Sequence, residues 1–208
     1  MIPAVLEQRR AGVLLHPTSL PGAAGSGDLG ADAHRFVDFL AQSGFSVWQM
    51  LPLGPTHRDG SPYHSLSLHA GNPMLISLDR LVEWGWLEPE RPEAGANVAA
   101  YRVERLAQAH KTFTQRATDS DQRAFEAFIN REAHWLEDYA LYRALRREFS
   151  GHAWFQWPAP LRDREPEALA AARARLADEL EQVCFEQFVF ARQWEALRAH
   201  AEQRNLLL

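Results

Sequence analysis

Several kinds of residue and motif are scarce or missing, and each absence excludes a class of protein. The 208 residues include one cysteine, so no disulfide can form within the chain. Low cysteine content is typical of a reducing compartment, and we expect a cytoplasmic location. No run reaches the roughly 18 consecutive apolar residues of a membrane-spanning helix. The formal net charge of -5 argues against nucleic acid or an anionic membrane surface as a partner.

Motifs for metal, nucleotide and thiol chemistry are also missing. No helix carries a His-x-x-x-His pair, and His64 and His69 lie in irregular chain, so no metal site is predicted. The glycine-rich loop "PGAAGSGDLG" lacks the Gly-Lys-Ser/Thr ending of a phosphate-binding loop. Cys184 stands among apolar residues in "LEQVCFEQFVF", which predicts a buried, unreactive thiol.

The N-terminal part carries the pattern of one β-α-β unit. Residues 11–16, "AGVLLH", and 45–53, "FSVWQMLPL", are short apolar runs typical of parallel strands buried on both faces. Between them, residues 31–44 space their apolar side chains as a helix does, with acidic residues near the start and Gly44 at the end. We expect the two strands to be parallel, with a right-handed connection.

The rest of the chain reads as mostly helical until its last residues. A final helix is expected from about Pro166 to Asn205, and its later, largely apolar part should be buried. Before it, "WFQWP" at 154–158 favours core packing over a ligand cage, because large aromatic residues are usually buried. The ending "NLLL" reads as the start of a third buried strand, so we expect a truncated domain.

Position selects one irregular stretch as a candidate binding loop. In parallel α/β proteins, ligands bind at the carboxyl ends of the strands. His16 directly follows the first predicted strand, and the stretch 59–73, "DGSPYHSLSLHAGNP", lies in the connection after the second. The residues alone leave two interpretations open: a binding loop, or a structural turn with Tyr63 packed under the helices.

Five segments, in order, resemble the N-terminal part of the amylomaltases, the 4-α-glucanotransferase family. They are "GVLLHPTSLPG", "GDLG", "WQMLPLGPT", "SPYHSLSLHAGNP" and "FEQFVFARQWEALRAHA". The resemblance implies an α/β fold, a partial (β/α)8 TIM barrel with a mostly helical insertion. It implies barrel strands one and two in residues 1–56, the insertion in 57–182, and a barrel helix leading into a truncated third strand in 183–208.

The resemblance also implies an activity. Family members pass segments of α-1,4-glucan between maltooligosaccharides or starch chains by a retaining mechanism, without a metal or organic cofactor. Their catalytic carboxylates follow later barrel strands, so no catalytic residue is assigned here and the chain alone is expected to be inactive. Two alternatives stay open, a non-catalytic glucan-binding module and an α-glucan hydrolase on the same barrel. The sequence leaves the oligomeric state open.

The candidate substrate-binding residues also come from the resemblance. Tyr63 is expected in the donor-side sugar site beside the scissile bond, with Ser61 hydrogen-bonding sugar hydroxyls. Asn72, His16 and Trp48 are further candidates, for which roles in shaping the turn or the core are at least as well founded. Many members carry Gly-Tyr-Gly-Asp where this chain has His-Arg-Asp-Gly at 57–60, which argues against an accessory glucan contact there.

Overall fold

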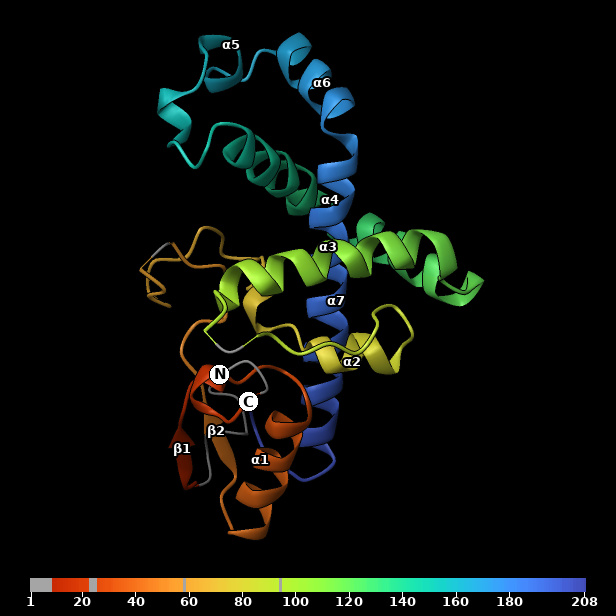
Figure 1. Ribbon diagram of the computed structural model, residues 1–208. Helices are drawn as coiled ribbons and strands as arrows, with labels where there is room; N and C mark the ends of the chain where they lie inside the picture. The colour runs from red at the N-terminus through yellow and green to blue at the C-terminus, as the bar shows by residue number, and fades with distance from the viewer. Residues whose placement is uncertain (1–8, 23–25, 58, 94) are drawn as a thin grey trace. The chain divides into compact units, whose positions relative to one another are not determined.

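The chain folds into two compact units (Figure 1). The computed structural model describes residues 9–22, 26–57, 59–93 and 95–208. The first unit comprises Met1–Ala109 and Val189–Leu208, and the second comprises His110–Phe188. Residues 57–109 therefore belong to the same unit as the strands, whereas 57 was the predicted start of the helical insertion. The division into barrel and insertion at these boundaries stays a prediction.

The first unit contains the predicted β-α-β arrangement. Strands β1 (Gly12–Leu14) and β2 (Val47–Gln49) are parallel neighbours, with Val13 opposite Trp48. Helix α1 (Ala31–Gln42) connects them. The chain turns at Gly44, whose φ of 80° is the left-handed conformation that glycine adopts without strain, so the predicted helix end is confirmed.

The last residues continue this sheet. Leu207 forms a parallel bridge with Val47, and its backbone forms hydrogen bonds with the residues before and after Val47. The N–H of Trp48 donates to the Leu207 carbonyl at 2.8 Å, and the N–H of Leu207 donates to the Ser46 carbonyl at 2.9 Å. The expected start of a third parallel strand is therefore present at this position, on the far side of β2 from β1.

The strands are shorter and less buried than predicted. Each has three residues, and the side chain of Leu14 is 58% exposed. Val13 packs against the core, whereas Gly12 and Leu14 face the opposite side of the sheet, because successive residues of a strand alternate. A strand is buried on both faces only when both faces are covered. Among the described residues, the core packs against the face of β1 that carries Val13, and the face that carries Leu14 is exposed.

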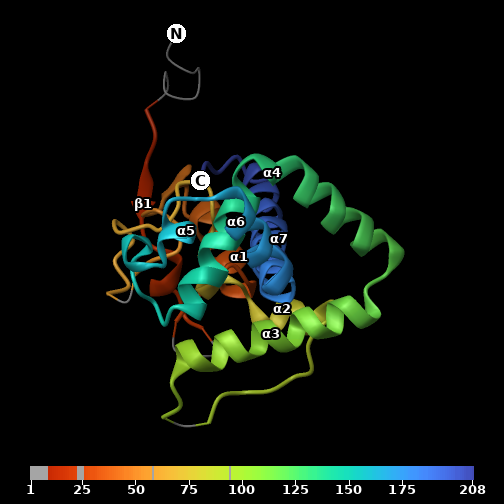
Figure 2. The same cartoon turned by 90° about the horizontal axis from the view of Figure 1, so that it is seen from above.

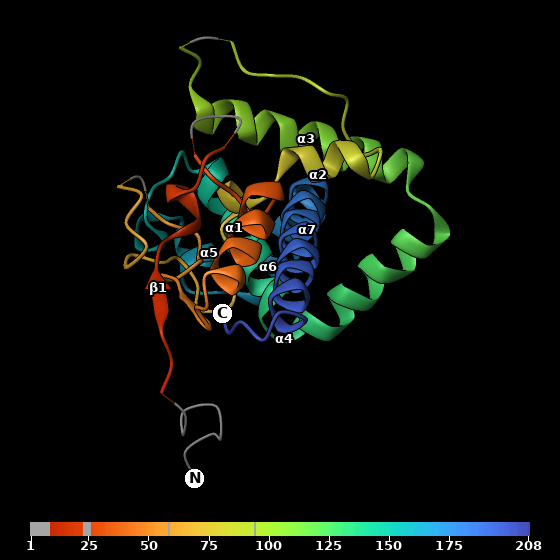
Figure 3. The ribbon, with the colours of Figure 1, turned by 90° about the horizontal axis from the view of Figure 1, so that it is seen from below.

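The core of the first unit lies between the sheet, α1 and the end of α7 (Ala177–Glu202), and Figure 3 shows α1 beside α7. Its buried side chains include Val37 and Leu40 from α1, Trp48 from β2, and Leu197 from α7. Three further short helices complete this unit: η2 (Pro17–Ser19), η3 (Pro73–Leu75) and α2 (Leu78–Glu83). Helix α3 (Val98–Arg116) begins in it.

The second unit is helical in its described residues. It contains α4 (Asp119–Glu148), η4 (Trp154–Gln156), α5 (Ala159–Arg162) and α6 (Pro166–Arg175) (Figures 1 and 2). The single final helix predicted from Pro166 is wrong, because Leu176, with φ of -106°, separates α6 from α7. Leu176 is buried in a cluster with Leu145 and Trp157. The helix is therefore interrupted at a residue held by tertiary packing, and no glycine or proline in the sequence signals the interruption.

Two predictions about single side chains need correction in this unit. In "WFQWP", Trp157 is buried as predicted, but Trp154 and Phe155 are 54% and 61% exposed. Cys184 is only half-buried. Partial burial nevertheless raises the pKa of its thiol to about 11, so the thiol is protonated and unreactive at neutral pH. Within the described residues, no helix is long and apolar enough to cross a membrane.

Candidate ligand-binding site

The two connections that follow β1 and β2 start from the same edge of the sheet. Beyond β1, the N–H of Leu15 still pairs with the Gln49 carbonyl at 3.0 Å, so the strands run together to this edge. The stretch 59–73 follows β2, and its position is the one at which parallel α/β proteins bind ligands.

A short hairpin carries the first part of this stretch. Thr56 forms an antiparallel bridge with Ser65, and the N–H of Leu66 donates to the Pro55 carbonyl at 2.8 Å. The strands of the hairpin pass close together at Gly54, where an added Cβ would clash with the hydroxyl of Ser65. The tip of the hairpin therefore has a fixed base.

Asp59 organises the tip of the hairpin. One of its carboxylate oxygens accepts from the N–H of Ser61 at 3.1 Å, and the other pairs with Nδ1 of His64 at 2.9 Å. The N–H of His64 also donates to the Ser61 carbonyl at 3.1 Å, which closes a turn with Pro62 and Tyr63 at its centre. The hydrogen bonds from His64 and Ser61 lower the pKa of Asp59, so its carboxylate stays ionised at neutral pH.

Tyr63 stands exposed on this turn. Its side chain is 72% exposed, so it is not packed under the helices, as the alternative interpretation of the sequence required. Ser61 and Pro62 are half-buried beside it. Proline restricts φ at the second position of the turn, and the Asp59 contacts hold both ends. The phenol ring is presented to solvent by an ordered backbone.

Asn72 shapes the end of the stretch. Its side-chain oxygen accepts from the N–H of Met74 at 3.0 Å and caps η3, and its own N–H donates to the Leu53 carbonyl at 2.8 Å. Next to it, Gly71 is buried against Phe190, and an added Cβ would clash with that ring. These contacts fix the course of the chain after the candidate loop.

Trp48 and His16 occupy supporting positions. Trp48 is fully buried, and its indole N–H donates to the Leu15 carbonyl at 2.7 Å, so as placed it has no surface for a ligand. Nδ1 of His16 lies 2.7 Å from the hydroxyl of Thr18, at the start of η2. Burial lowers the pKa of His16, although the nearby Pro52 carbonyl opposes the shift. No protein atom in the described residues meets hydrogen-bond geometry with its Nε2.

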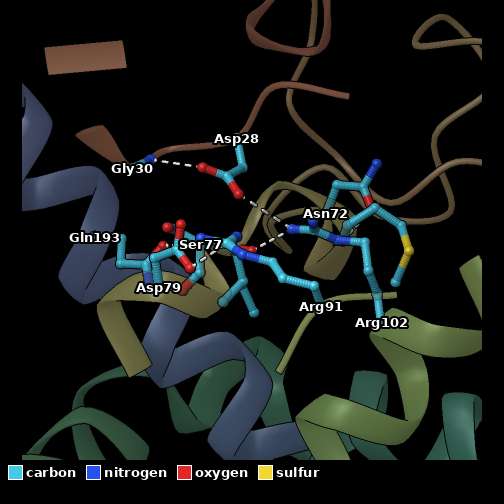
Figure 4. Close-up of polar contacts among 10 residues, drawn as sticks. Asp28, Gly30, Asn72, Ser77, Asp79, Arg91, Arg102 and Gln193 are labelled. Carbon is cyan, nitrogen blue, oxygen red and sulfur yellow. Dashed lines mark hydrogen bonds and ion pairs between the residues drawn. The ribbon is translucent and has the colours of Figure 1, made fainter. Parts of the chain in front are cut away.

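A buried ion pair between Asp28 and Arg102 lies near the segment that follows Asn72 (Figure 4). The sequence did not predict it. The carboxylate of Asp28 accepts from the N–H of Gly30 at 2.9 Å and lies 3.6 Å from the guanidinium of Arg102. Arg102, which is almost fully buried, also donates to the Ile76 carbonyl. The sequence pattern marks Asp28 only as one of the acidic residues near the start of α1. No local pattern pairs it with a residue of α3, so only the fold reveals this contact.

Arg102 links the loop before α1 to the segment that follows Asn72, and the Gln193 amide holds that segment against α7. The backbone of Ser77 donates to Gln193 at 2.7 Å and accepts from it at 3.1 Å. Burial raises the pKa of Asp28, while Arg102 opposes the shift; burial likewise lowers the pKa of Arg102. For each group, burial disfavours the charged form and the partner favours it.

The described residues contain no group of three or more His, Cys, Asp or Glu side chains that could hold a metal ion. The site instead combines one exposed aromatic ring, one hydroxyl and backbone polar groups. The described residues thus combine parallel strands with a locally braced, irregular stretch at the carboxyl edge of the sheet, which is where parallel α/β proteins bind ligands.

Comparison with known proteins places the chain within a family. The sequence model of the 4-alpha-glucanotransferases matches residues 15–208, and the chain belongs to this family. It is 46% identical over 200 residues to the 4-alpha-glucanotransferase of Thermus thermophilus, covering 93% of this chain and 40% of the relative. The Synechocystis 4-alpha-glucanotransferase is 42% identical over 214 residues, covering 98% and 42%.

A solved structure agrees with this assignment. The amylomaltase from Streptococcus agalactiae, solved in complex with acarbose, matches with a TM-score of 0.85 and 32% identity. The match covers 96% of this chain and 42% of that protein. The chain therefore spans about two fifths of the length of the relatives that it matches.

Proposed function

We propose that the chain is the N-terminal part of an enzyme that transfers α-1,4-glucan segments between maltooligosaccharides or starch chains, and that Tyr63 binds a glucose unit on the donor side of the scissile bond. The observation that carries this proposal is the exposed Tyr63 ring on a braced turn at the carboxyl edge of the sheet. Family membership supplies the class of substrate.

The arrangement of strands supports a (β/α)8 barrel as the complete fold. β1, β2 and Leu207 are adjacent and parallel in chain order, and an α-helix precedes each new strand. This is the repeating pattern of such a barrel, whose active sites lie at the carboxyl ends of the strands. The candidate loop occupies that end.

The chemistry of the turn suits a sugar. The flat face of Tyr63 can cover the apolar face of a glucose ring, while its phenol and the Ser61 hydroxyl can exchange hydrogen bonds with sugar hydroxyls. Pro62 and Asp59 hold these groups in place before the substrate arrives, which reduces the entropy lost on binding. Asn72, His16 and Trp48 would act by shaping and supporting the loop.

In this proposal the reaction is a retaining double displacement. One carboxylate attacks the anomeric carbon and forms a glycosyl-enzyme bond, while a second carboxylic acid protonates the glycosidic oxygen of the departing glucan. The hydroxyl of the acceptor glucan then displaces the first carboxylate and gives its proton to the second. The carboxylates themselves are expected outside residues 1–208. We assign no catalytic residue to this chain and expect no transfer by it alone.

The test replaces Tyr63 in an active enzyme that contains this segment, for example a chimera of residues 1–208 with the remainder of the Thermus thermophilus relative. Loss of the ring contact and one hydrogen bond, each worth about 1 kcal/mol, predicts a roughly ten- to hundredfold fall in turnover for Tyr63→Ala. Tyr63→Phe, which keeps the ring, should lose less. Leu68→Ala is the matched control, because Leu68 is an exposed residue of the same stretch.

Turnover of maltotriose and thermal stability are measured on the same preparations. Unchanged turnover of Tyr63→Ala would refute the proposed role of Tyr63. An equal loss in Leu68→Ala would show that the loop responds to any substitution, and would also count against a specific contact.

A further inference from the structure

The second unit contains a pocket that the proposed function does not use. Its volume is about 280 Å³, close to the lower limit of about 300 Å³ for small-molecule sites. The lining combines aromatic and charged side chains, among them Tyr142, Trp154, Trp157, Asp138, Arg162 and Arg164. Few, well-placed polar groups around an apolar floor are typical of binding pockets.

Trp154, which lines this pocket, and its neighbour Phe155 face solvent, whereas Trp157 in the lining is buried. Trp157 is part of the core, and its indole N–H donates to the His152 carbonyl at 3.2 Å. Trp154 and Phe155 are exposed, with ring centroids 5.9 Å apart and planes at 81°. Within the described residues, the Trp154 indole N–H makes no hydrogen bond. Trp154 therefore offers an uncovered apolar face next to an available donor.

Each of the two arginines that line the pocket already has a carboxylate partner, which favours a neutral ligand. Arg162 forms two hydrogen bonds with Asp163, at 2.8 and 2.9 Å. Arg164 forms two with Asp138, at 3.0 and 2.8 Å, and Arg173 approaches the same carboxylate at 3.4 Å. An anionic ligand would have to compete with these carboxylates. A hydroxyl-rich ligand can use the remaining donors and acceptors without breaking the pairs.

We propose that this pocket is a second glucan-binding site, in which Trp154 stacks on a glucose unit and the Asp138–Arg164 pair contacts its hydroxyls. An α-glucan is neutral, presents alternating apolar faces and hydroxyl rims, and matches each feature of the pocket. The choice of an α-glucan rests on the proposed function. The site itself uses side chains of the second unit and none from the stretch 59–73.

The experiment separates this site from the one at Tyr63. The 208-residue chain carrying Tyr63→Ala is run in native gels with and without soluble starch, and its affinity for maltoheptaose is measured by calorimetry, with cellohexaose as the β-linked comparison. Trp154→Ala and Phe155→Ala are added to this background. Phe39→Ala, which removes an equally exposed aromatic residue from α1, is the matched control.

We expect the Tyr63→Ala chain to bind maltoheptaose, Trp154→Ala to weaken binding about tenfold, and Phe155→Ala to weaken it about threefold. Trp154→Phe should recover part of the loss because it restores a ring. Helical circular dichroism checks that each variant is folded. No binding by the Tyr63→Ala chain, or equal binding with and without Trp154, would overturn the proposal. Failure of the function proposed for Tyr63 would appear separately, as unchanged turnover of Tyr63→Ala in the chimera.

Discussion

Trp48 lies in β2 and Tyr63 lies in the connection that follows it, yet their environments are opposite. Trp48 is fully buried and donates a hydrogen bond to the Leu15 carbonyl. Its ring packs edge-on against Phe36, with the ring centroids 4.9 Å apart. Tyr63 is mostly exposed, and its position depends on contacts between Asp59, Ser61 and His64. The scaffold is held by residues far apart in the sequence, whereas the turn is held by its own neighbours.

This difference separates stability from binding. A residue in the scaffold contributes to the free energy of unfolding through packing, and its loss is felt throughout the unit. A residue on a locally braced turn can be changed at little cost to the fold. Residues of the second kind are free to serve a ligand, and the following substitutions test whether the distinction holds.

The largest effect is expected for Trp48→Ala. Truncation of a fully buried tryptophan typically costs about 3–5 kcal/mol, and this one also leaves the Leu15 carbonyl without its donor. Urea denaturation followed by circular dichroism measures the loss. Tyr63→Ala is the reference and should change the free energy of unfolding by no more than about 0.5 kcal/mol. Similar losses for the two variants would contradict the comparison.

A somewhat smaller effect is expected for Arg102→Ala, which leaves the Asp28 carboxylate buried without its partner. Removing one member of a buried pair costs about 3 kcal/mol or more. The pKa of Asp28 is raised in the folded state, so the cost should be least at low pH and should grow as pH rises through that pKa. Unfolding of the variant is therefore followed at several pH values.

The second variant in this test is Asp28→Asn combined with Arg102→Ala. A neutral amide needs no countercharge, so the double variant should recover part of the stability at neutral pH. If it is no more stable than Arg102→Ala, then Arg102 acts through its contact with the Ile76 carbonyl and not through Asp28.

The smallest effect concerns the turn itself. The pKa of Asp59 is lowered below its ordinary value of 3.8, first by the hydrogen bond from His64. A lowered pKa means that the stabilisation is present above 3.8 and is lost as pH falls through the folded value. Titration of the Asp59 carboxyl by NMR should show this shift, and His64→Ala should return the pKa toward 3.8 with at most a small loss of global stability. An unshifted Asp59 would show that the turn is not braced in this way.

The sequence predicted much of the scaffold of the first unit, and it singled out one candidate loop. Apolar periodicity located α1, a glycine located its end, and the apolar runs located two parallel strands and the start of a third. These features follow from local backbone preferences and from the need to bury apolar side chains. The family motifs then pointed to the stretch 59–73 as a ligand loop.

Other features were decided by the tertiary structure. The sequence predicted that Leu14 and Trp154 would be core residues, but both are exposed. Burial depends on what covers a side chain, and local sequence does not contain that information. The Asp28–Arg102 pair and the division between α6 and α7 likewise depend on partners brought together by folding. Sequence alone determined α1, the two parallel strands and the start of the third, and their order along the chain. The packing of those elements decided which aromatic residues became core, as Trp48 did, and which remained free to meet a ligand, as Tyr63 did, because exposure is set by neighbours in space.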